Sequence, residues 1–109
     1  KIYVVVRYNP KKQPVSEFVP DAFKQLRGSA KDAKITTLPD LNRSGGKPAY
    51  IRYNFEAPSL SEQGYETQAV TSDGDKDGNS FVVTIVLTAN SRDAFKAAEP
   101  VFLTLLNGY

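Results

Sequence analysis

The chain lacks cysteine, histidine, methionine and tryptophan altogether. Without cysteine, disulfides, thiolate catalysis and zinc–thiolate sites are excluded. Without histidine, the chain has no imidazole metal ligand and lacks the usual general base near neutral pH. Any catalysis would depend on Asp, Glu, Lys or Tyr with a strongly shifted pKa. We therefore expect a protein that is not an enzyme.

Long apolar runs are also missing. The longest, Phe81 to Leu87, has the length of a β-strand, whereas a membrane-crossing helix needs ~20 apolar residues. A hydrophobic fraction of 40% and a charged fraction of 24% over 109 residues are typical of one globular domain. The chain begins at Lys1 instead of methionine, so we expect a processed or trimmed protein, which leaves open a removed signal peptide or a missing N-terminal segment. We favour an extracytoplasmic over a cytoplasmic location.

The charge is unevenly distributed, although the net charge is only +2. Residues 1–54 hold eleven Lys or Arg against four Asp or Glu, and residues 55–109 hold three against eight. Such asymmetry can mark a polyanion-binding face. No compact Lys/Arg cluster accompanies this asymmetry. We therefore favour the interpretation that strands from the two halves of the chain alternate in one sheet, so that their charges mix on the surface.

Hydrophobic patterns predict the order β-α-β-β-β-β-α. β-branched and aromatic residues indicate strands at 2–8, 33–38, 49–55, 65–71 and 81–88, the last apolar on both faces as in a central strand. A helix is expected at 20–27, with Gly28 just past its end. Consecutive strands with short connections favour an α+β domain, a mostly antiparallel sheet with helices packed on it.

The tail, residues 91–107, carries a broad apolar stripe and predicts a helix capped by Asn90 or Ser91. Pro100 predicts a kink, or a short turn at 92–98 followed by a helix that begins at the proline. The stripe residues expected to be buried on the sheet are Phe95, Phe102, Leu105 and Leu106.

The segment Asp73-Gly74-Asp75-Lys76-Asp77-Gly78-Asn79 is the strongest chemical motif. Asp73, Asp75 and Asp77 match positions 1, 3 and 5 of a calcium loop, with Gly78 at position 6. Position 12 is Thr84 instead of the bidentate glutamate, and the flanks are strands, so an EF-hand is excluded. A polar hairpin would use the same residues. We favour the plain turn and keep a weak calcium site as the alternative.

Two further patterns have ordinary structural explanations. Aromatic residues with arginines could stack single-stranded nucleic acid, but no RNA-binding signature accompanies Tyr3, Tyr8, Tyr50, Tyr53, Arg7 and Arg52. Sheet packing is the favoured interpretation. Paired carboxylates for glycosidic chemistry could be sought among Glu56, Glu62 and Glu66, which we assign to a solvated surface.

The second half of the chain, about residues 48–109, resembles the PsbP-like family, which includes the extrinsic subunit of photosystem II and its bacterial relatives. The resemblance is carried by Gly64-Tyr65-Glu66-Thr67, the polar turn at 72–80, the strand 81–89, and Phe95-x4-Pro100-x-Phe102-x2-Leu105-Leu106. It implies a hairpin with a central strand that leads into a terminal helix covering the sheet. It implies no shared functional residues, because the fold serves divergent roles.

These observations favour a non-catalytic binding or accessory module that engages a protein partner and needs no cofactor. The first alternative is a calcium-stabilised extracytoplasmic module with its metal in the 73–79 loop. The second is a single-stranded nucleic-acid binder.

Overall fold

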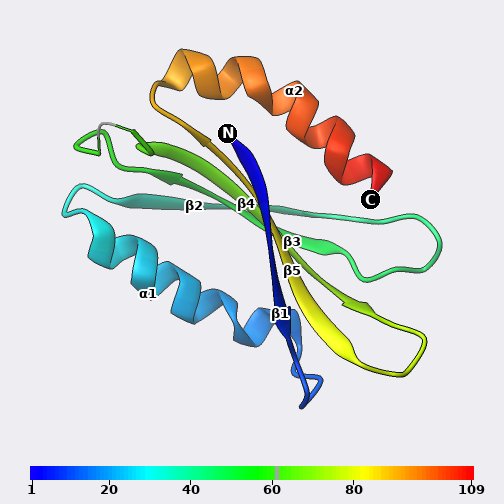
Figure 1. The fold of residues 1–109 in the computed structure, drawn as a ribbon. Coiled ribbons are helices and arrows are strands. Elements are labelled where there is room, and N and C mark those ends of the chain that lie inside the picture. The colour runs from blue at the N-terminus through cyan, green and yellow to red at the C-terminus, as the bar shows by residue number, and fades with distance from the viewer. Residues whose placement is uncertain (61) are drawn as a thin grey trace.

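The computed structural model describes residues 1–60 and 62–109. Its strands form one antiparallel sheet in the order β1-β5-β4-β3-β2. Figure 1 shows a helix on each face of this sheet. The elements are β1 (Ile2–Tyr8), α1 (Val19–Ser29), β2 (Lys34–Leu41), β3 (Tyr50–Glu56), β4 (Tyr65–Gly74), β5 (Ser80–Ala89) and α2 (Arg92–Gly108), with a 3-10 turn at Val15–Glu17. The predicted element order and the α+β class are confirmed.

One face of the sheet packs against α2. Phe95, Phe102 and Leu106 are buried against Val83, Ile85 and other residues of this face. Leu105 was expected with them, but its side chain is 40% exposed, so that prediction is wrong. At ~100° per residue, Leu105 lies about 60° away from Phe102 around the helix, on the side away from Leu106.

The opposite face packs against α1. Tyr53 and buried valines of β4 and β5 form a cluster with the apolar side of this helix. The ring of Phe23 meets that of Tyr53 edge-on, with centroids 4.8 Å apart. Strand β5 lies between β1 and β4 and contributes to both clusters, which explains its apolar sequence. Its prediction as an inner strand with both faces covered is confirmed.

Two predicted element ends, before Pro39 and at Gly28, are wrong. β2 does not stop before Pro39 but continues to Leu41, with a register shift after Leu38. It is an edge strand, where a missing N–H costs no ladder bond. Gly28 does not end α1, which includes it and continues to Ser29.

Helix α2 is continuous through Pro100, so of the two alternatives the short turn at 92–98 followed by a new helix is wrong, whereas the kink stays a prediction. Ser91 caps the helix, and its hydroxyl accepts a bond from the Ala94 N–H at 3.1 Å. Buried side chains lie on both sides of Pro100, at Phe95 and Phe102. Their packing holds both halves of the helix on the sheet, at the cost of one intrahelical hydrogen bond.

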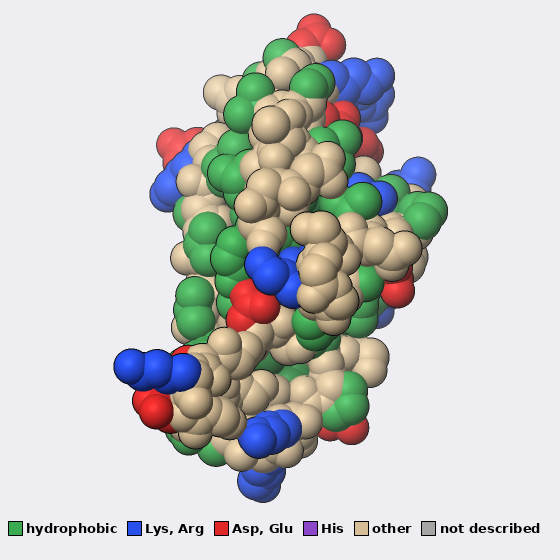
Figure 2. Space-filling view, turned by 90° about the vertical axis from the view of Figure 1, so that its right-hand side faces the viewer, with side chains coloured by type: hydrophobic (Ala, Val, Ile, Leu, Met, Phe, Trp, Pro, Cys, Tyr) green, Lys and Arg blue, Asp and Glu red, His purple; other side chains and the backbone are tan. Residues whose placement is uncertain are grey.

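The charges of the two halves mix on the surface. Strands of the first half lie at both edges of the sheet, and β5 of the second half pairs with β1 of the first. Figure 2 shows Lys/Arg and Asp/Glu side chains interspersed on the side that carries the loops after β2 and β4. Within the described residues, no helix is long and apolar enough to span a membrane.

Candidate functional site

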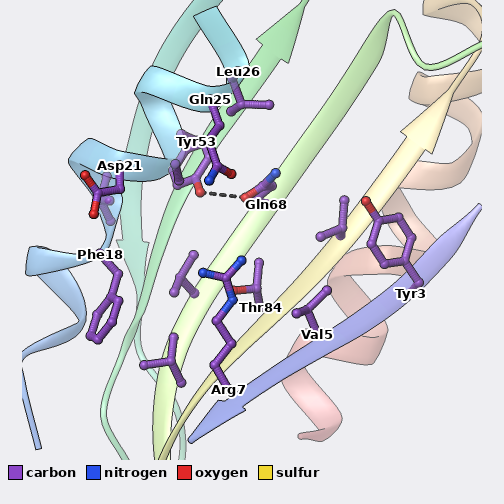
Figure 3. Close-up of a pocket in the computed structure, with 15 residues that line it drawn as sticks. Tyr3, Val5, Arg7, Phe18, Asp21, Gln25, Leu26, Tyr53, Gln68 and Thr84 are labelled. Carbon is purple, nitrogen blue, oxygen red and sulfur yellow. Dashed lines mark hydrogen bonds between the residues drawn. The ribbon is translucent and has the colours of Figure 1, made fainter. Parts of the chain in front are cut away.

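A pocket opens on the α1 face of the sheet, between that helix and β1 (Figure 3). It encloses about 250 Å³. Helix α1 contributes one wall, β1 the other, and β4 and β5 the floor between them. The residues that line it are Tyr3, Val5 and Arg7 of β1, Phe18, Val19, Asp21, Ala22, Gln25 and Leu26 beside or on α1, and Tyr53, Gln68, Val70, Val82, Thr84 and Val86 of the sheet.

The floor is mainly apolar. Val70, Val82 and Val86 are each at most 4% exposed, yet they line the pocket. Val5 on the edge strand and Leu26 on the helix continue this apolar surface up both walls. The pocket therefore offers burial to an apolar group of a ligand.

Arg7 supplies the positive charge of the pocket. Strand alternation places Arg7 on the same face as Val5, and its side chain extends from β1 into the pocket (Figure 3). Among the described residues, Arg7 forms no ion pair. The pocket thus combines an apolar floor with a guanidinium group that is available to an anion.

Three polar side chains of the neighbouring strands β3 and β4 are linked by hydrogen bonds beside this floor. The Tyr53 hydroxyl donates to Gln68 Oε1 at 2.6 Å, and Gln68 Nε2 donates to Glu66 Oε2 at 2.5 Å. Burial raises the pKa of the Glu66 carboxyl above its usual range. Burial, and then the charge of Glu66, raises the pKa of Tyr53 to about 12.

Glu66 was predicted to lie on a solvated surface, and that prediction is wrong, because the residue is only 6% exposed. A signal was present in the sequence. Alternation puts Glu66 and Gln68 on the same face as the apolar Val70, so a polar pair inside the core could have been suspected. The three candidate carboxylates are not brought together: Glu56 lies on the opposite face and pairs with Arg92 at 3.4 Å, and Glu62 is exposed on the connection.

The aspartates of the predicted loop lie apart. Asp73 lies in β4, where its carboxylate pairs with Arg43 at 3.1 Å and accepts a bond from the Tyr109 hydroxyl. Asp75 accepts bonds from Asn79 and from the Asp77 N–H, all at 2.9 Å. The described residues contain no group of three His, Cys, Asp or Glu placed to hold a metal ion.

Arg43 was missed by the sequence analysis. Its side chain is 2% exposed and lies between the rings of Tyr50 and Tyr109, 5.3 and 4.6 Å from their centroids. Burial opposes ionisation of Asp73, but bonds from Tyr109 and Arg43 bring its pKa below the usual range. This cluster ties the β2–β3 loop and the end of α2 to β4, and no local pattern could reveal it.

The tyrosines considered for nucleic-acid stacking do not form a platform. Tyr50 and Tyr53 are buried, at 0% and 1% exposure, on opposite faces of the sheet. Tyr3 lines the pocket, whereas Tyr8 lies on the other face, where its ring contacts that of Phe81 at a tilt of 46°. Comparison with known proteins found no matching family model, no matching curated protein and no matching solved structure.

Proposed function

We propose that this protein is a non-catalytic binding module whose pocket between α1 and β1 takes an extended segment of a partner protein. The segment would place an apolar side chain on the valine floor and a carboxylate against Arg7. The observation that carries the proposal is the guanidinium of Arg7, free of any ion pair among the described residues, above an apolar floor.

The size of the pocket favours a peptide over a larger organic ligand. Sites for drug-sized molecules usually enclose roughly 300–1,000 Å³. A volume of about 250 Å³ suits one or two side chains of a longer chain. Arg binds a carboxylate through two parallel bonds, so it would fix the position and direction of an acidic residue in that chain.

The relationship to the PsbP-like family belongs to the same proposal. It is supported by the arrangement of the second half, in which the β4–β5 hairpin leads into α2 and the apolar stripe of that helix covers the sheet. A scaffold with divergent roles is compatible with a partner site that is specific to this chain.

Selection from a displayed random-peptide library tests the proposal. We expect enriched peptides that combine an acidic residue with a neighbouring apolar residue and that shift the amide signals of Val5, Val82 and Thr84. Arg7→Gln should weaken binding by about tenfold or more, because a charged hydrogen bond contributes roughly 1.5–3 kcal/mol.

Lys96→Gln is the matched control, because it removes one positive charge from an exposed position on α2, on the opposite side of the sheet. Binding of the selected peptides should survive it. Peptides without an acidic preference, or affinity lost equally in both variants, would show that the pocket is not the binding site.

A further inference from the structure

Among the described residues, strand β1 is a free edge of the sheet. It pairs with β5 on one side, and no described residue pairs with its other side. Four of its hydrophobic side chains are exposed: Val4 53%, Val5 37%, Val6 59% and Tyr8 61%. The other edge, β2, carries Pro39 and a register shift, both of which discourage strand addition. β1 has neither of these.

Hydrogen bonds to β5 show which backbone groups of β1 remain free. Lys1 and Thr88 exchange two bonds of 2.8 Å, and the Asn9 N–H donates to Ser80 O at 2.8 Å. In an antiparallel pair these directions alternate, so the odd-numbered residues bond to β5. The N–H and C=O groups of the even-numbered residues, Ile2, Val4, Val6 and Tyr8, therefore point outward.

We propose that this edge binds a second copy of the chain, with β1 pairing antiparallel to β1 of the other copy around a two-fold axis at Val5. The two five-stranded sheets then form one continuous sheet. In this register Ile2 is bonded to Tyr8 and Val4 to Val6 of the other copy, which uses every outward backbone group of the strand. Val5 meets its own counterpart.

The side chains of the strand complement themselves in the same register. On the pocket face Tyr3 lies opposite Arg7 of the other copy, twice by symmetry, and an arginine beside an aromatic ring is attractive. On the α2 face Val4 lies opposite Val6, and exposed Leu105 and Tyr109 extend this apolar area. An isologous interface needs such self-complementarity.

The neighbouring registers are worse. A shift of two residues in one direction centres the pair on Val4 and brings Lys1 opposite Arg7, two like charges. A shift in the other direction centres it on Val6 and places Arg7 opposite Val5, so the tyrosine–arginine pairs are lost. The order of side chains along β1 thus favours pairing with a second copy of β1 in the register centred on Val5.

Sedimentation analysis from micromolar to millimolar protein tests the assembly. We expect the parent to reach the mass of two chains, and Val6→Pro to keep the mass of one chain with its thermal midpoint largely unchanged. The Val6 N–H points outward, so proline removes an intermolecular bond without breaking the β1–β5 ladder. Val101→Ser removes another exposed valine, on α2, and should still dimerise.

A cysteine scan tests the register, and the chain has no other cysteine to interfere. Under mild oxidation Val5→Cys should form a disulfide-linked dimer, because residues opposite each other in a non-hydrogen-bonded pair have Cα atoms about 4.5 Å apart. Val4→Cys and Val6→Cys would crosslink only in the two shifted registers, so in the proposed register they should remain largely without the disulfide. A parent that is monomeric throughout, a dimer that persists in Val6→Pro, or crosslinking at Val4 or Val6 in place of Val5 would overturn the proposal.

Discussion

Glu66 is the most unusual single residue of the described chain, because it is a carboxyl group held inside the core. Its raised pKa means that the folded protein binds a proton more tightly than the unfolded chain. This residue therefore lowers the free energy of unfolding as pH rises from its unfolded pKa through its folded pKa. Below both values the penalty is absent.

We predict that Glu66→Gln raises the thermal midpoint at neutral pH, since the amide keeps an acceptor for Gln68 and carries no buried charge. Below the unfolded pKa of the glutamate, the variant and the parent should melt together. Thermal melts across a pH series measure the difference. A gain that is independent of pH would contradict the assigned cause.

Gly64 is required by close backbone packing. A Cβ at this position would lie 2.7 Å from the Leu60 carbonyl oxygen and 2.9 Å from that of Ala57. Gly64→Ala should therefore destabilise the protein by about 1–3 kcal/mol, as overpacking generally does. Denaturant unfolding measures this cost.

Gly28→Ala is the matched control. A Cβ there meets nothing within 4 Å, and the residue lies inside α1. The same substitution should stabilise the protein by up to roughly 1 kcal/mol, because alanine favours a helix. Equal effects at the two glycines would rule out the close approach at Gly64.

At the scale of elements, α2 is held on the sheet by one narrow stripe of buried side chains. Phe102 is 3% exposed, so Phe102→Ala should lower the free energy of unfolding by about 3–5 kcal/mol. Leu105→Ala, three residues later on the same helix, should cost far less because its side chain is 40% exposed. Denaturant melts of the two variants compare them directly. Similar losses would show that the helix is rotated from its described position.

The β4–β5 turn is held by its own hydrogen bonds. Asp75 accepts three of them within the loop, and Asp73 is engaged by Arg43 and Tyr109. We predict that millimolar calcium produces no saturable shift of the amide signals of residues 72–80, since binding would have to break these bonds. A saturable shift that disappears in Asp75→Ala would instead establish the calcium site.

For the whole molecule, the strand order predicts a gradient of local stability. β4 and β5 are inner strands joined by the longest ladder of the sheet, and both contribute to both cores, whereas β1 and β2 have a free edge among the described residues. Hydrogen exchange should be slowest in β4 and β5, and fastest in the outward amides of Val4 and Val6. Rising protein concentration should protect those two amides if β1 pairs with a second copy.

Much of the fold could be predicted from the sequence. Alternating or continuous apolar runs and turn residues are local signals, so five strands, two helices, their order and the burial of β5 on both faces were all predicted correctly. The errors at Pro39 and Pro100 arose where neighbours in space override a local preference. An edge position tolerates the first proline, and packing on both sides holds the second inside a helix.

The candidate site was decided by tertiary structure alone. Arg7, Val82 and Leu26 line one pocket although they come from three separate elements, and Arg43 meets Asp73 and Tyr109 across the chain. Such contacts depend on strand order and on how far α1 reaches across its face, which no local pattern contains. Composition determined which chemistries are excluded, because a missing side chain is missing in every fold. The tertiary structure determined what the remaining side chains do, because the burial of each side chain and its neighbours in space set its charge and its contacts.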